Sequence, residues 1–119
     1  LYTSESKHVL IGVRHVKRGD IGYNGLFFGG NMLAWTDELV YSHVTELMKT
    51  KMVVTARIDN CRFMRPVFEE DRIQIYSRVD KMTEHKVKVH VTAVCDTRQV
   101  FEADFLFVKL KEIPVRSKL

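Results

Sequence analysis

The segment that most constrains the fold is residues 31–49, NMLAWTDELVYSHVTELMK, which contains neither glycine nor proline. Its apolar residues recur at helical spacing. They are Leu33, Val40, Val44 and Leu47, with Met32, Trp35, Leu39 and Met48 widening the stripe. This pattern predicts one long helix, apolar on most of its sides and therefore largely buried.

Strand-like segments surround this helix. Residues 7–16 precede it, and four stretches of period-2 or β-branched character follow it at residues 52–64, 72–81, 86–95 and 99–110. The connections between the last four are short, which favours antiparallel neighbours. We therefore expect an α+β domain in which an antiparallel five-stranded sheet wraps round one helix. An edge strand and an exposed apolar surface would remain, so a dimer is the minimum expectation.

The size and composition predict a single soluble domain over residues 1–119. Hydrophobic residues make up 45% of the chain and charged residues 29%, which excludes a disordered or fibrous chain. No apolar run approaches the length of a membrane span. Two cysteines, Cys61 and Cys95, are too few for a disulfide scaffold, and no histidines at ligand spacing complete a zinc site, so we expect two buried free thiols and no metal. We also expect no cofactor.

The net charge of +4 suits a polyanionic small molecule as well as a nucleic acid. Lys86 and Lys88 alternate with valines, and no aromatic residues are interleaved to stack on bases. We therefore expect no nucleic-acid partner.

Asp37 is the first candidate for chemistry. Its neighbours three and four residues away on the helix are all apolar or aromatic. An ionised carboxylate in such surroundings is costly unless it is paired, hydrogen-bonded or used by a site. Asp37 is therefore either a buried structural carboxylate or a functional one.

The start of the helix supports the functional interpretation. Five glycines, Gly19, Gly22, Gly25, Gly29 and Gly30, fall within twelve residues, and the last two directly precede the helix. Such clustering indicates positive φ or close approach by another group. Unshielded amides at a helix N-terminus bind anions or a carbonyl oxygen. A carbonyl held there would lie one to two turns from Asp37 or near the Asp37 of a partner subunit.

Three motifs in order resemble the hotdog-fold acyl-CoA thioesterases of the 4-hydroxybenzoyl-CoA thioesterase-like superfamily. They are F-G-G-x-x-x-x-W-x-D-E from Phe28, V-V-T ending at Thr55, and F-M-R-P-V from Phe63. The resemblance covers roughly residues 20–110, most of the chain. It implies hydrolysis of an acyl-CoA to a free acid and CoA, in dimers or trimers of dimers with active sites between protomers, and CoA enters as part of the substrate.

The resemblance also assigns roles to individual residues. Asp37 matches the carboxylate that acts as general base or nucleophile, the Gly30 amide matches the oxyanion donor, and Thr55 matches a threonine that lines the pocket. Many relatives have Asn or Asp at the position of Gly22, and Asn24 is the nearby candidate to replace it.

The rest of the substrate-binding residues follow from the needs of CoA. Gly29 and Phe28 border the helix start, and the phosphates require cations. The candidate cations are Arg65, Lys81 and Lys86, which lie near strand ends or turns.

Two alternatives to a thioesterase remain. One is a non-catalytic acyl-CoA binding module in which Asp37 is structural. The other is a hydratase-type hotdog enzyme with an Asp and His pair, but His43 is six residues from Asp37 and so faces another side of the helix.

The tail, residues 111–119, ends in Ser117, Lys118 and Leu119. S-K-L at an extreme C-terminus is a peroxisomal address read by an import receptor. If Leu119 is the native terminus, we expect a location in peroxisomes or related organelles such as glycosomes. Otherwise the expectation is the cytoplasm.

Overall fold

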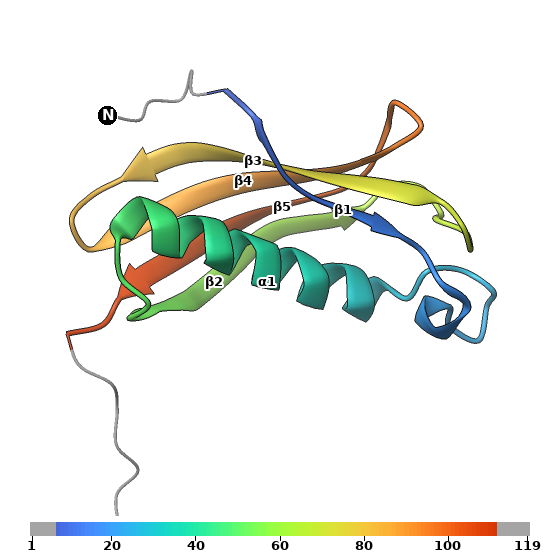
Figure 1. Cartoon of the computed structure of the whole chain (residues 1–119), viewed down its shortest axis with the longest axis horizontal. Coiled ribbons are helices and arrows are strands. Elements are labelled where there is room, and N and C mark those ends of the chain that lie inside the picture. The colour runs from blue at the N-terminus through green and yellow to red at the C-terminus, as the bar shows by residue number, and fades with distance from the viewer. Residues whose placement is uncertain (1–6, 112–119) are drawn as a thin grey trace, which may run out of the picture.

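One long helix lies along one face of a five-stranded sheet in the computed structural model, which describes residues 7–111 (Figure 1). The elements are β1 (Val9–His15), a short 3-10 helix (Arg18–Asp20), α1 (Gly29–Met48), β2 (Val53–Phe63), β3 (Arg72–Met82), β4 (Lys86–Cys95) and β5 (Arg98–Lys109). Every strand pair is antiparallel, and the order across the sheet is β1-β3-β4-β5-β2. The expected α+β architecture is confirmed.

The predicted strand boundaries differ from the observed ones by at most two residues, whereas the helix begins two residues earlier than expected. The amides of Asn31 and Met32 both donate to the Phe28 carbonyl, at 3.0 and 3.2 Å. Phe28 is therefore the N-cap, and Gly29 and Gly30 form the first turn. Glycine is costly mainly in a helix interior, so Gly29 and Gly30 can form the first turn and the helix begins before residue 31.

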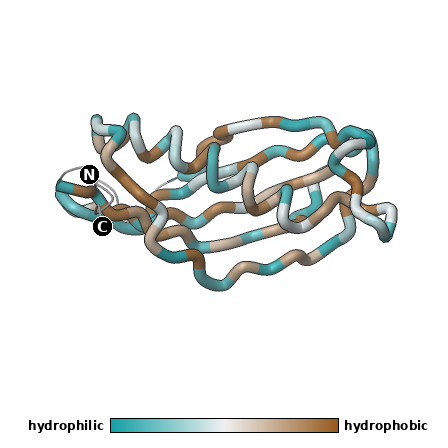
Figure 2. The backbone as a smooth tube through the Cα atoms, turned by 90° about the horizontal axis from the view of Figure 1, so that it is seen from below, coloured by the Kyte–Doolittle hydropathy of each residue, from teal (hydrophilic) through white to brown (hydrophobic). Residues whose placement is uncertain are grey.

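Alternation of side chains across the sheet builds the core. The hydropathy of the residues alternates along the strands in Figure 2, and the inward-facing residues are fully or almost fully buried. On β4 and β5 they are Val87, Val89, Val91, Ala93, Phe101, Ala103, Phe105 and Phe107. The inward face expected for residues 86–95 is confirmed.

The helix is less buried than the sequence predicted. Its fully buried positions follow a single line at a spacing of four residues, namely Met32, Thr36, Val40 and Val44. Thr36 is fully buried, and its hydroxyl donates to the carbonyl oxygens of Met32 and Leu33 at 2.9 Å. Leu33, Leu39 and Trp35 are only half-buried. One sheet covers one side of a helix, so the other apolar sides remain open in a single protomer.

Exposed apolar side chains lie on both edge strands, β1 and β2, and at the helix. Phe63 and Val54 on β2 are 55% and 41% exposed, and Phe28 and Tyr41 lie at the start of α1 and within it. Because β2 pairs only with β5, its second edge is free for another chain.

The prediction of two buried thiols is half wrong. Cys95 is buried and Cys61 is exposed, and neither forms a disulfide. Cys61 lies on the edge strand β2, which no neighbouring strand covers on its far side. Within residues 7–111, no helix is long and apolar enough to cross a membrane.

Candidate active site

The structure brings Asp37 and Thr55 into direct contact. The Thr55 hydroxyl on β2 donates to Asp37 Oδ1 on α1 at 2.7 Å, and both residues are half-buried. This is the one hydrogen bond to the Asp37 carboxylate among the described residues. The second oxygen is therefore available to a water molecule or a substrate.

The entry of the helix presents the second half of the predicted site. The amides of Gly29 and Gly30 occupy the first two positions of α1, where no helical carbonyl can accept from them. A Cβ on Gly30 would lie 2.7 Å from Phe28 Cε2, so only glycine fits against this ring without displacing it. A Cβ on Gly29 would meet the Phe63 ring at 3.3 Å. Two exposed aromatic rings thus flank the free amides.

A cavity of about 430 Å³ opens at this helix start. Its wall is mainly apolar, formed by Leu26, Phe27, Met32, Phe63, Met64 and Val67, and Asn24, Gly29 and Arg65 add polar groups. An apolar cavity with a few polar groups suits an acyl chain and its carbonyl. Among the described residues, neither Asp37 nor Thr55 lines it.

The free amides and the carboxylate are too far apart to act on one atom within a single chain. Gly30 and Asp37 are seven residues apart on α1, which at about 1.5 Å per residue separates them by about 10 Å. A general base must lie within about 3 Å of the proton it takes. Within one chain, the Gly30 amide and the Asp37 carboxylate therefore lie about two helical turns apart.

Asn24 lies at the cavity, but its side-chain oxygen is occupied. Asn24 Oδ1 accepts from the Leu26 amide at 3.0 Å, which closes a turn beside Gly25, the one described glycine with positive φ (+81°). The side chain therefore shapes the loop, and its amide nitrogen is the group left to face a ligand.

The candidate cations fall at opposite ends of the molecule. Arg65 follows β2 and lines the cavity at the helix start. Lys81 and Lys86 flank the β3–β4 turn, which lies beside the C-terminal end of α1 (Figure 1). At this turn the His85 carbonyl accepts a hydrogen bond from the Lys109 amide at the end of β5. Within one protomer Lys81 and Lys86 therefore do not reach the cavity. The sequence could not show this, because each of the three simply lies near a strand end.

The His43 side chain turns away from Asp37. Its Nδ1 lies 3.2 Å from the Oγ of the buried Ser77, and burial lowers the pKa of His43 although Glu46 opposes the shift. An Asp and His pair as in a hydratase is therefore not formed by these residues in one chain.

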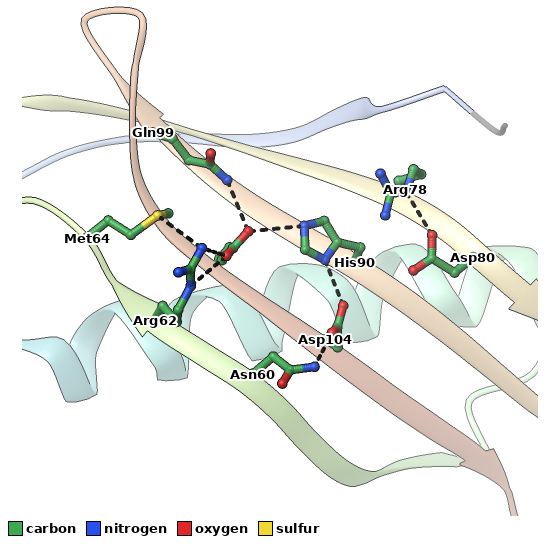
Figure 3. A network of polar contacts seen from close by, with 9 residues as sticks. Asn60, Arg62, Met64, Arg78, Asp80, His90, Gln99 and Asp104 are labelled. Atoms are coloured by element: carbon green, nitrogen blue, oxygen red, sulfur yellow. Dashed lines mark hydrogen bonds and ion pairs between the residues drawn. The ribbon is translucent and has the colours of Figure 1, made fainter. Parts of the chain in front are cut away.

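Sequence reasoning missed a second polar cluster on the outer face of the sheet (Figure 3). His90 Nδ1 lies 2.7 Å from Asp104 Oδ1, Asn60 donates to Asp104 Oδ2 at 2.9 Å, and Arg62 pairs with Glu102. Asn60 has φ of +53°, at a register shift in β2. The alternation over residues 86–95 already predicted that His90 faces outward, but its pairing with Asp104 depends on the register between β4 and β5.

Possible metal ligands gather in one place among the described residues. Asp71, Cys95 and Asp96 offer atoms within 4.8 Å of one another. Burial raises the pKa of the Cys95 thiol, and the neighbouring Asp71 and Asp96 carboxylates raise it further. Without a cation the thiol is therefore held protonated. Ser117, Lys118 and Leu119 lie outside the described residues, so the targeting prediction stays a prediction.

The fold and the site define a hotdog-type protein with a carboxylate on its central helix. Residues 24–102 match the family model described as the thioesterase superfamily, and the chain belongs to this family. A comparison with curated protein sequences gave no significant match.

Solved structures of acyl-CoA thioesterases have the same fold. A hexameric thioesterase from Yersinia pestis is 23% identical with a TM-score of 0.81, over 87% of this chain and 88% of the other. A hexameric broad-specificity acyl-coenzyme A thioesterase is 22% identical with a TM-score of 0.83, over 88% and 81%. An acyl-CoA hydrolase from Staphylococcus aureus, solved with butyryl coenzyme A, is 22% identical with a TM-score of 0.80, over 92% and 70%. The predicted hotdog fold is confirmed.

Proposed function

We propose that the protein hydrolyses an acyl-CoA thioester to a free acid and CoA. The observation that carries this proposal is the half-buried Asp37 carboxylate, oriented by the Thr55 hydroxyl and with one oxygen unoccupied. Membership of the thioesterase superfamily and the acyl-CoA thioesterases of the same fold support it.

The chemistry divides between two groups. The Gly30 amide donates to the thioester oxygen and stabilises the negative charge that develops there. In one route Asp37 removes a proton from the attacking water and the C–S bond breaks. In the other, Asp37 attacks the carbonyl carbon, the C–S bond breaks, and water then hydrolyses the resulting acyl anhydride to release the acid and the Asp37 carboxylate. The CoA thiolate leaves and takes up a proton, so that one water is consumed for each acid and thiol formed.

We further propose that two copies of the chain form each site. The separation of about 10 Å along α1 between Gly30 and Asp37 supports it. Thr55 lies on the free edge strand β2, close to the exposed Val54, where a second chain can bury apolar surface. The hexameric state of the structural neighbours is compatible with such a pairing.

The first experiment is hydrolysis of a panel of acyl-CoAs, from acetyl to long-chain and aromatic, by wild type and Asp37→Asn, with free thiol as the readout. Turnover in wild type that Asp37→Asn reduces by about 10²-fold or more is expected, because the substitution keeps the volume and deletes the base. Binding of acyl-CoA without turnover in either protein would instead establish a non-catalytic binding module.

Complementation tests the shared site. Asp37→Asn and Gly30→Pro should each be inactive alone, because proline removes the amide donor at the second helical position and its ring displaces the exposed Phe28 side chain. Co-expressed, they should recover roughly a quarter of wild-type activity, since half of randomly assorted dimers are hybrids and each hybrid keeps one intact site. A site built within one chain would recover none.

A further inference from the structure

A second cavity, of about 610 Å³, adjoins the cavity at the helix start. The two share Arg65, Pro66 and Val100 as a common wall. The second cavity extends to the β4–β5 turn, where Cys95, Thr97 and Arg98 line it. A ligand held at the Gly29 and Gly30 amides can therefore continue past Arg65 toward this turn.

The strand register aims Arg98 into this second cavity. On β5 the inward-facing residues are odd-numbered from Phe101 onward, so a regular strand would point Arg98 outward. The pairing shifts between Ala93↔Phe101 and Val94↔Gln99, which leaves Val100 as an extra residue on β5. This bulge reverses the alternation and places Arg98 opposite the buried Cys95, on the helix side of the sheet.

The turn itself holds this arrangement in place. Asp96 and Thr97, the two residues between β4 and β5, have φ of +51° and +65°. Positive φ at both central residues is the geometry of the tight two-residue hairpin whose twist matches the strands. Arg98 therefore starts from a rigid backbone, as a binding residue should.

Arg65 and Arg98 differ from most of the other described arginines because neither forms an ion pair. Five arginines of the described residues form ion pairs with carboxylates: Arg14, Arg18, Arg57, Arg62 and Arg78. Within residues 7–111, Arg65 and Arg98 form none, although both line the same cavity. Unpaired guanidinium groups match the geometry of phosphate oxygens.

Two carboxylates line the same cavity and compete with an anion. One Asp71 oxygen accepts from the Phe68 amide at 2.8 Å, whereas Asp96 lies exposed in the turn. Since neither forms an ion pair with Arg65 or Arg98, both guanidinium groups remain free.

We propose that Arg98, together with Arg65, binds the phosphate groups of the CoA moiety. The thioester then lies at the Gly29 and Gly30 amides, and the pantetheine arm runs along the wall that the two cavities share. This inference rests on the proposed function. It adds Arg98 to the substrate-binding residues. Within one protomer the phosphates would then bind near the β4–β5 turn, whereas Lys81 and Lys86 lie near the β3–β4 turn at the other end of the sheet.

Kinetics with and without phosphates test the proposal. Arg98→Gln should raise KM for an acyl-CoA by about 10-fold or more, the worth of a charge-assisted hydrogen bond, and leave kcat/KM for the matching acyl-N-acetylcysteamine thioester unchanged. The matched control is Arg78→Gln on the outer face, where Arg78 pairs with Asp80 (Figure 3) and should affect neither substrate. An equal loss for both thioesters, or no change for the CoA ester, would overturn the proposal.

Direct binding separates this inference from the proposed activity. If wild type hydrolyses no thioester, calorimetry with CoA and with pantetheine still reports the phosphate contribution, which Arg98→Gln should reduce by about 10-fold in CoA affinity. Asparagine tolerates the positive φ of position 96, so Asp96→Asn should keep the turn. Because it removes a carboxylate from the cavity, it should bind CoA as tightly as wild type or more tightly. Weaker CoA binding in Asp96→Asn would contradict direct binding by the arginines and indicate a cation bridge.

Discussion

Asp37 and Asp104 are both largely withdrawn from water, one on the helix side of the sheet and one on the outer side. Asp104 is enclosed by partners, since Asn60 donates to one oxygen and His90 contacts the other. Asp37 has a single described partner, Thr55, on one oxygen. Asp104 therefore completes a closed network (Figure 3). Asp37 retains an oxygen that can accept a proton from a ligand.

The partners of Asp104 also affect its pKa. Burial alone would raise its pKa, but hydrogen bonds from Asn60 and His90 and the nearby charges of His90 and Lys88 outweigh burial, so the pKa lies below its ordinary value. A carboxylate held this firmly in its charged form is a poor general base. Partner number, more than burial, therefore distinguishes Asp104 from Asp37, the carboxylate proposed as the general base.

The largest effect expected is on turnover, and it should fall on one carboxylate only. Asp37→Asn should lower kcat/KM for acyl-CoA by about 10² to 10⁴-fold, the usual contribution of a general base. Asp104→Asn should stay within a few-fold of wild type in the same thiol-release assay. Comparable losses in the two variants would remove the distinction between them.

The next largest effect expected is that of removing the Thr55 hydroxyl, which donates to Asp37. Thr55→Val should lower kcat by about 10-fold, because it removes a charge-assisted hydrogen bond that orients Asp37 and is worth about 1.5 to 3 kcal/mol. Thr55→Ser is the control that keeps the hydroxyl and should retain most of the activity. If valine and serine behave alike in steady-state kinetics, the 2.7 Å contact has no role in catalysis.

Asp104 should contribute to the pH dependence of the free energy of unfolding. Because its folded pKa is lowered, it stabilises the fold above its unfolded pKa near 3.8, and this stability is lost as the pH falls through that value toward the folded pKa. Asp104→Asn should lower the free energy of unfolding at neutral pH by about 1 to 3 kcal/mol.

Urea unfolding at pH 7 and at pH 3 checks this prediction. The variant should lose less stability than wild type between the two pH values. A wild-type slope that the substitution leaves unchanged would show that Asp104 is not the titrating group.

The smallest effect expected is that of Asn24→Ala. Since Asn24 Oδ1 accepts from the Leu26 amide, its removal should loosen the loop and cost only a few-fold in kcat/KM, far less than Asp37→Asn. Aspartate at this position keeps the turn and is the matched control. A loss equal to that of Asp37→Asn would assign Asn24 the loop role that relatives give to the position of Gly22.

The amino-acid sequence determined the elements and named the catalytic candidates, with Asp37 and Gly30 as the principal ones and Thr55 as a residue lining the pocket. Period 3.6 over residues 31–49 and period 2 over residues 86–95 are local signals, so they specify a helix and a strand without knowledge of the fold. The motifs carrying the resemblance identified Asp37 and Thr55, and the structure places the two side chains in contact. The peroxisomal signal remains a prediction from the sequence.

Only the tertiary structure decided which residues share a space. Lys81 and Arg65 looked equivalent as basic residues near strand ends, but the antiparallel order of the sheet separates them. The bulge at Val100 turns Arg98 inward, and the register across β4 and β5 brings His90 to Asp104. Pairing register and bulges arise from contacts between residues distant in the chain, and a one-residue shift moves a side chain to the opposite face. No local pattern contains that information.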